Sequence, residues 1–280
     1  MEIKATDVKK LREKTGAGMM DCKKALQESG GDFAKAEKIL KELGLAAAAK
    51  RSDRATNEGR IFSSVKGNIG ALLELTCETD FVAKNQDFIN YGTDMVNYVV
   101  DNKLSEMDST LEGKVKDALS HIKENITCKR FKYIEAADDE LIVDYIHGVG
   151  SIGVLVKIKA SDKAAVANDA VKEFAFDCAL HIAAFNPMYL NRDSVDRKYI
   201  QEQEEIFTTQ AKNTGKPENI VAGIVKGKLN KHLSEICFLN QPFVKDDKQS
   251  VEAVMKAVGK EAGAELSIAE YIYYKTGEEI

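Results

Sequence analysis

Residues Ile69 to Leu75 read IGALLEL, and residues Ile152 to Ile158 repeat this pattern as IGVLVKI. A second β-rich run precedes each copy, at residues 61–65 and 141–147, with a glycine-containing turn between the two runs. Two apolar runs joined by such a turn are typical of an antiparallel hairpin. The repeat therefore indicates an internal duplication, in which each copy is one supersecondary unit.

Helical patterns follow both copies, at residues 87–100 and 164–184, and the first copy has another around residues 111–122. Strands and helices that alternate in this way, with hairpins in place of crossovers, are typical of the α+β class. We therefore predict two related α+β subdomains with antiparallel sheets. Their expected ranges are residues 60–140 and 141–280.

The first 45 residues read as three short helices that form a domain of their own. Glycines separate them at 16–18 and 30–31, and Asp32 is placed to cap the third helix, which we expect to stop at Gly44. So small a module has little room for an active-site cavity, so it is typical of a protein-binding unit. Residues 46–59 are small and charged, and we predict a linker that is helical at first.

An insertion interrupts the second subdomain at about residues 190–232. It reads as two polar helices with thin apolar seams, joined by Gly215-Lys216-Pro217. Glycine ends a helix well and proline suits the first turn of the next, which predicts an antiparallel helical hairpin. Beyond it we expect a strand at residues 236–244, a helix at 250–262 and a closing strand at 268–274.

Composition excludes several classes of protein. Hydrophobic residues make up 44% of the 280 positions and charged residues 30%, which is ordinary for a soluble domain. The net charge of −5 argues against non-specific nucleic-acid binding, and no apolar run is long enough to span a bilayer. The start, MEIKATDVKK, lacks an apolar signal core, and the five cysteines stand singly. We expect a cytoplasmic protein with no membrane and no direct nucleic-acid partner.

Motifs for catalysis or cofactors are weak. Gly148 to Gly153 match GxGxxG, but a strand-like run follows where a nucleotide site needs a helix, so we interpret the match as a hairpin turn. Cys178 and His181 lie three apart without further ligands nearby, which favours packing over a metal site. The sequence predicts no enzyme, no cofactor and no metal.

Two stretches remain unusual. Met19 and Met20 follow a glycine turn and cannot both face one small core, so at least one is expected at the surface, where it suits a protein interface. In Thr79-Asp80-Phe81-Val82-Ala83-Lys84-Asn85, Thr79 or Asp80 suits a helix cap. Phe81 either staples that helix end or stands exposed as an aromatic anchor, and physical reasoning alone favours the staple.

These two stretches, in this order, resemble the signatures of the elongation factor Ts family. LREKTGAGMMDCKKAL, at residues 11–26, is similar to the N-terminal signature, and TDFVAKN, at residues 79–85, is similar to the second. The similarity continues through the segments at residues 147–148, 152–156, 181–184, 215–217 and 239–244 and covers essentially the whole chain.

The resemblance implies a ubiquitin-associated-like N-terminal domain, a core of two related subdomains and a coiled-coil hairpin. It also implies a guanine-nucleotide exchange factor that binds elongation factor Tu with GDP bound, disturbs its Mg²⁺ and phosphate site, and promotes GDP release so that GTP can load. The partner is expected in its GDP-bound and nucleotide-free forms, and a 2:2 assembly stays open.

The resemblance assigns roles to particular residues. The expected contacts to elongation factor Tu are Arg12, Met19, Met20, Lys23 and His147. The residues expected to dislocate the partner's Mg²⁺ are Thr79, Asp80, Phe81 and Val82. One position departs from the family's pattern, because Lys123 stands where members commonly have glycine.

Two alternatives come from other classes of protein. The first is a helical adaptor or holdase whose N-terminal module binds some other protein. The second is a dehydrogenase built on Gly148 to Gly153, which retention of NAD(H) would reveal.

Overall fold

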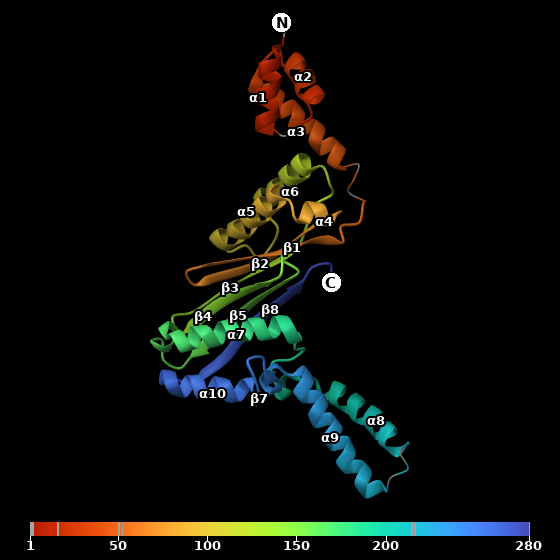
Figure 1. Cartoon of the computed structure of the whole chain (residues 1–280), viewed down its shortest axis with the longest axis vertical. Coiled ribbons are helices and arrows are strands. Elements are labelled where there is room, and N and C mark those ends of the chain that lie inside the picture. Colours follow the sequence, from red (N-terminus) through yellow and green to blue (C-terminus); the bar gives the residue numbers. More distant parts are fainter. Residues whose placement is uncertain are drawn as a thin grey trace. The chain divides into compact units, whose positions relative to one another are not determined.

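The computed structural model describes residues 3–15, 17–49, 51, 53–213, 215 and 217–279, with the backbone alone at residues 45–49 and 219. The fold is mixed α and β, with three N-terminal helices followed by antiparallel sheets and further helices (Figure 1), which confirms the predicted class. The chain forms two compact units. The first comprises Met1–Ile134, Ile146–Gly153 and Tyr274–Ile280, and the second comprises Glu135–Tyr145 and Val154–Tyr273. The four-part division stays a prediction.

The three N-terminal helices are α1 (Ala5–Thr15), α2 (Met19–Glu28) and α3 (Phe33–Ala49). Each contributes apolar side chains to a small core that includes Leu11, Leu26 and Leu40. The prediction that α3 stops at Gly44 is wrong, because the helix continues to Ala49. Gly44 instead permits close packing, since a Cβ there would lie 2.0 Å from the Ser120 hydroxyl oxygen. Gly16, at the predicted break, lies outside the described residues.

The first sheet has the strand order β1-β2-β3, where β1 is Glu58–Lys66, β2 is Ile69–Cys77 and β3 is Thr127–Glu135. Strands β1 and β2 are antiparallel, which confirms the predicted hairpin. Helices α5 (Gln86–Asn102) and α6 (Ser109–Ile122) supply much of the core beside β2. Strand β3 was not expected, because its sequence TCKRFKYIE is rich in charge and alternates only briefly, at Phe131 and Tyr133.

The second sheet has the order β4-β5-β8, with β4 at Glu140–His147, β5 at Ile152–Ala160 and β8 at Leu266–Lys275. Helix α7 (Asp169–Phe185) follows η1 (Ala165–Ala167) and runs along this sheet, and α10 (Val251–Ala262) packs against α7 (Figure 1). The repeated sequences therefore form the central strands, β2 and β5, of two three-stranded sheets. This is the arrangement that the duplication predicts.

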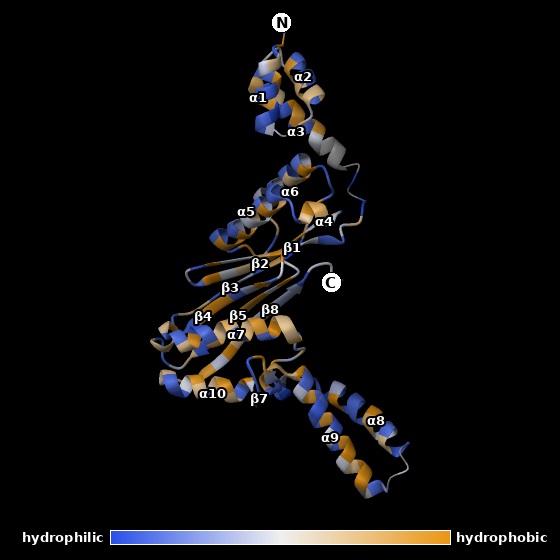
Figure 2. Ribbon diagram, in the orientation of Figure 1, coloured by the Kyte–Doolittle hydropathy of each residue, from blue (hydrophilic) through white to orange (hydrophobic). Residues whose placement is uncertain are grey.

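The inserted hairpin consists of α8 (Arg197–Lys212) and α9 (Glu218–Ile236), which pack against each other after the short η2 (Arg192–Ser194). Most of the α8 ribbon has the colour of hydrophilic residues in Figure 2. Lys216, in the predicted connecting turn, lies outside the described residues.

The strand expected at residues 236–244 is wrong. Helix α9 continues to Ile236 and is followed by η3 (Phe238–Asn240), and only β6 (Pro242–Phe243) pairs with β7 (Asp246–Ser250). Apolar periodicity in so short a run does not distinguish a strand from a buried helix end.

Among the helices of the described ranges, none has the length and hydropathy needed to cross a bilayer.

Candidate functional site

The second signature forms an ordered turn between β2 and α5. Its helix, α4 (Asp80–Ala83), is capped by Thr79, whose hydroxyl oxygen accepts from the Val82 amide at 3.3 Å. Asn85 then caps α5 by accepting from the Asp87 amide at 2.7 Å. These caps satisfy amides that a helix start leaves without internal partners. The expectation that Thr79 or Asp80 caps a helix here is confirmed for Thr79.

Phe81 is exposed at the surface of this turn. Its exposed fraction is 82%, whereas its neighbour Val82 packs against the core beside β2 and Ala83 is buried. The staple interpretation of Phe81 is therefore wrong, because Val82 is the residue that packs beneath the turn. In Figure 2 α4 is a visibly hydrophobic segment. An exposed ring on an ordered turn is available to enter a pocket on another protein.

Asp80 is engaged by a neighbour one turn away. Its carboxylate lies 2.6 Å from the Lys84 ammonium nitrogen, with both side chains at the surface. The hydrogen bond from Lys84 holds the pKa of Asp80 below its usual value. Asp80 is thus ionised at neutral pH, and its charge is partly offset by Lys84.

The turn is also held from behind by Glu124, a residue that the sequence did not single out. One carboxylate oxygen accepts from the backbone amides of Glu78 and Thr79, both at 3.1 Å, and the other accepts from the Thr79 hydroxyl at 2.7 Å. Glu124 directly follows Lys123, the position that departs from the family pattern.

Lys123 itself has a left-handed backbone, with φ of 67°, at the C-terminal cap of α6. Glycine adopts that conformation without strain, which gives a physical reason for a glycine there. The Lys123 carbonyl accepts a hydrogen bond from Arg51.

The N-terminal signature places its predicted contact residues at the surface of the three-helix module. Helix α2 turns Cys22, Ala25 and Leu26 inward. Met19 and Met20 therefore stay 46% and 66% exposed, so both methionines, not just one, are at the surface. The remaining predicted contacts of this module, Lys23 on α2 and Arg12 on α1, are also exposed.

His147 and the GxGxxG match lie at the turn between β4 and β5. The side chain of His147 is exposed, and its carbonyl accepts from the amides of Gly150 and Ser151. Gly150 has φ of 99° and its carbonyl accepts from the Ile61 amide at 2.8 Å. A Cβ on Gly153 would lie 2.3 Å from the Ile61 side chain. Close approach to β1 explains these glycines, and a strand follows them, which confirms the predicted hairpin turn.

His181 and Cys178 are buried on α7. The two ring nitrogens of His181 are both engaged, with Nδ1 accepting from the Val244 amide at 3.2 Å and Nε2 lying 2.9 Å from the Gln241 amide oxygen. Burial raises the pKa of the Cys178 thiol well above its usual value, which keeps it protonated. Within the described ranges no cluster of three or more His, Cys, Asp or Glu side chains is arranged to hold a metal.

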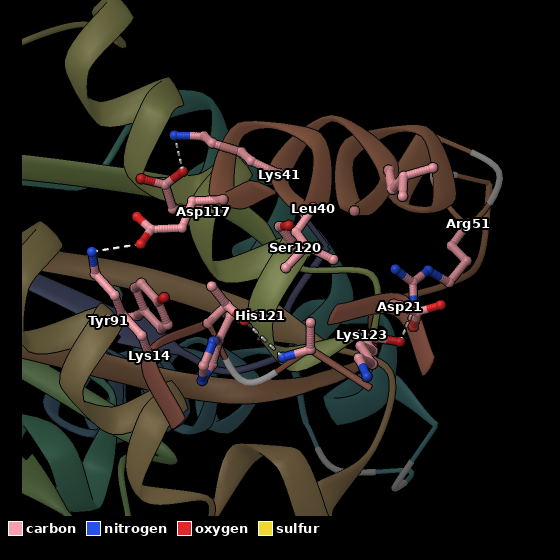
Figure 3. Close-up of a pocket in the computed structure, with 15 residues that line it drawn as sticks. Lys14, Asp21, Leu40, Lys41, Arg51, Tyr91, Asp117, Ser120, His121 and Lys123 are labelled. Atoms are coloured by element: carbon pink, nitrogen blue, oxygen red, sulfur yellow. Dashed lines mark hydrogen bonds and ion pairs between the residues drawn. The ribbon is translucent and has the colours of Figure 1, made fainter. Parts of the chain in front are cut away.

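A cavity of about 620 Å³ lies inside the first unit, between the three-helix module and helices α5 and α6 (Figure 3). Its polar lining is largely engaged, since the Lys41 ammonium lies 2.7 Å from Asp117 and the His121 imidazole lies 3.5 Å from Asp87. Lys14, also in the lining, pairs with Glu37. Small-molecule sites are usually apolar with a few free polar groups, so this lining fits a contact between helices better than a cofactor pocket.

Together, these observations describe a mixed α and β protein with a three-helix N-terminal module and two three-stranded sheets whose central strands carry the repeated sequence. The comparisons are more specific. The family model described as Elongation factor TS matches residues 78–278. The chain therefore belongs to the elongation factor Ts family.

Curated relatives carry the same name over nearly the full length. Elongation factor Ts of Treponema denticola is 50% identical over 277 residues, covering 99% of this chain and 99% of the relative. The protein of that name from Borreliella burgdorferi is 45% identical over 276 residues, covering 98% and 99%, and that from Borrelia recurrentis is 45% identical over 278 residues, covering 99% and 100%.

Proposed function

We propose that this chain is a guanine-nucleotide exchange factor for elongation factor Tu in translation elongation, a role that belongs to the cytoplasm. It binds elongation factor Tu with GDP bound, disturbs the Mg²⁺ and phosphate site of that partner, and promotes GDP release so that GTP can load. Family membership supports the role, and the exposure of Phe81 on an ordered turn is the single observation that carries the mechanism.

The mechanism needs no acid, base or cofactor from this chain. An exchange factor accelerates release by binding the nucleotide-free partner more tightly than the loaded one. Thermodynamic reciprocity then requires two equal effects. Bound nucleotide lowers the affinity of elongation factor Tu for this protein by the same ratio by which this protein lowers its affinity for nucleotide. Complementary surfaces supply this difference in affinity, so the protein acts by binding and not as an enzyme.

Phe81 supplies the wedge in this proposal. An aromatic side chain exposed on a short helix gains apolar contact only when it enters a pocket on another protein. Insertion between elements of elongation factor Tu shifts the groups that hold Mg²⁺ and phosphate. Asp80, ionised beside Lys84, adds negative charge near that site, while Thr79 and Val82 hold the turn in place.

The other predicted contacts extend the docking surface. Met19 and Met20 are adaptable apolar side chains flanked by cationic residues, a combination suited to a protein interface. In the proposed complex Arg12, Met19, Met20 and Lys23 bind the nucleotide-binding domain of elongation factor Tu. His147 makes a further contact from the β4–β5 turn.

The test is release of a fluorescent GDP analogue from purified elongation factor Tu, chased with unlabelled GDP, with and without this protein. Strong acceleration by substoichiometric protein supports the proposal, and an unchanged release rate contradicts it. A second arm removes Mg²⁺ with a chelator. If the factor acts by disturbing the Mg²⁺ site, its additional acceleration shrinks once the metal is gone. Light scattering of the purified complex distinguishes 1:1 from 2:2 stoichiometry.

A further inference from the structure

The turn that carries Phe81 and the segment after α6 hold each other through exchanged carboxylates. The Glu124 carboxylate accepts from the amides of Glu78 and Thr79 and from the Thr79 hydroxyl. In return, the Glu78 carboxylate accepts from the backbone amide of Asn125 at 2.7 Å. Hydrogen bonds to ionised acceptors are about twice as strong as neutral ones, so this reciprocal pair is a strong tertiary clamp.

We propose that Glu124 is a positioning residue for Phe81: its carboxylate fixes the start of α4 and so holds the exposed aromatic ring ready for insertion. This inference rests on the proposed exchange function and deepens it. Glu124 does not itself touch the partner in this proposal.

The Thr79 hydroxyl connects the two ends of this arrangement. A hydroxyl has one proton, and here that proton goes to Glu124, which leaves the oxygen lone pairs for the Val82 amide. The Glu124 carboxylate therefore sets the rotamer that caps α4. Phe81 is the second residue of the same turn, so its backbone position depends on that cap.

Helix α4 needs such support because it has only four residues. A single helical turn is unstable alone, since nucleation fixes several residues for each hydrogen bond gained. Ala83 and Val82 anchor its far side in the core, and Glu124 anchors its beginning. With 82% of its surface exposed, Phe81 is held mainly by the turn beneath it.

The clamp also reaches the segment that leads into β1. The Arg54 guanidinium lies 3.1 Å from the Glu78 carboxylate. The backbone carbonyl of Arg54 accepts from the Asn125 side-chain amide at 2.7 Å. The Asn125 amide and then Arg54 lower the pKa of Glu78, so this carboxylate stays ionised in its role as acceptor. Four residues from three separate segments thus converge behind the Phe81 turn.

The first test measures the order of the turn in the free protein. The sequence contains no tryptophan, so Phe81→Trp introduces a single fluorescent reporter at the position of interest. Time-resolved anisotropy of this variant should show little fast local motion, and adding Glu124→Gln should increase the amplitude of that motion. Glutamine keeps the shape but loses the charge. If its oxygen accepts from the two amides, its NH2 group faces the Thr79 hydroxyl, whose proton then loses its acceptor. The matched control Glu112→Gln alters an exposed carboxylate on α6 and should leave the anisotropy unchanged.

The second test measures exchange in the otherwise unmodified protein. We expect Glu124→Gln to lower stimulated GDP release by about two- to tenfold, which corresponds to the cost of about 0.5–1.5 kcal/mol for ordering one loosened side chain on binding. In a double-mutant cycle, Glu124→Gln should have little further effect once Phe81→Ala is present, since both changes then remove the same contribution.

Three outcomes overturn the inference: unchanged anisotropy, unchanged exchange, or an equal loss of exchange with and without Phe81. Failure of the parent protein to stimulate release contradicts the proposed function instead, and the anisotropy test still decides whether Glu124 orders the turn. If Glu124→Gln does not fold, Thr79→Val cuts the link at its other end and should raise the mobility at position 81 in the same way.

Discussion

Glu74 and Lys157 occupy the same place in the two repeated sequences, on the central strands β2 and β5, and carry opposite charges. Glu74 is fully buried and lies 2.7 Å from the Arg130 guanidinium on β3. Lys157 lies 3.6 Å from Glu270 on β8 and 3.9 Å from Glu140 on β4. In each sheet, the charge at this position of the central strand is therefore neutralised by opposite charges on neighbouring strands. The signs are reversed between the two sheets.

Glu74→Gln should destabilise the protein by about 2–3 kcal/mol, because removing one partner of a buried ion pair leaves the other without full compensation. Glu74 also accepts from the Gly277 amide at 2.9 Å, so the segment after β8 should loosen as well. Chemical denaturation measures the free energy of unfolding, and hydrogen exchange measures protection at Gly277. The control Glu112→Gln changes an exposed pair and should alter stability by less than about 0.5 kcal/mol. A loss that small for Glu74→Gln contradicts the prediction.

The sequence predicted the elements whose signals are local. The two hairpins follow from short β-rich runs around glycine turns, and helix α10 begins directly after its capping residue Ser250. Strand β3 was missed because its charged side chains find partners only in the folded sheet, as Arg130 does with Glu74. The burial of β3 depends on its pairing with β2, and no local sequence pattern predicts that pairing.

The candidate site shows the same limit. The local sequence around Phe81 fits both a staple and an exposed anchor, and what holds the turn lies elsewhere in the chain. Glu124 is 45 residues away from Thr79 along the chain, yet it fixes the cap of α4. Motif similarity identified the turn, while the tertiary contacts of Glu124 could not be read from spacing.

Lys123→Gly should stabilise the protein by about 1 kcal/mol. The left-handed backbone of Lys123 is costly for a residue with a Cβ, and glycine removes that cost with some loss of entropy. The hydrogen bond from Arg51 goes to the backbone carbonyl and is retained. Thermal unfolding tests this. Lys116→Gly, inside the same helix, should instead destabilise by about 1 kcal/mol. If Lys123→Gly and Lys116→Gly destabilise the protein equally, the left-handed backbone at Lys123 is not a source of strain.

The buried His181 should make stability depend on pH. Because the Val244 amide donates to Nδ1, the proton of neutral His181 is on Nε2 and donates to Gln241. Burial holds the pKa of His181 below its ordinary value of 6.5, despite the opposing effect of Gln241. The contribution of neutral His181 to the free energy of unfolding is full above pH 6.5, the ordinary pKa. It is lost as pH falls from 6.5 toward the lower pKa of the folded state, by no more than about 1.4 kcal/mol per pH unit.

Unfolding free energies at about pH 7.5 and about pH 5.5 test this dependence. His181→Asn should reduce the difference between the two values, whereas His147→Asn, at an exposed position, should retain it. A parent protein whose stability is flat across this range contradicts the assignment.

Phe81→Ala should leave the fold intact, because the ring is exposed and makes little contribution to the core. If the ring is the wedge, truncation removes about 2–4 kcal/mol of binding to the nucleotide-free partner, or roughly 30- to 1000-fold. Stimulated release of the fluorescent GDP analogue should then fall by one to three orders of magnitude. Lys248→Ala, at an exposed position outside both signatures, should change nothing measurable. Circular dichroism and thermal unfolding establish that the fold is retained, so near-normal stimulation by Phe81→Ala would mean that the ring is not the group that opens the nucleotide site.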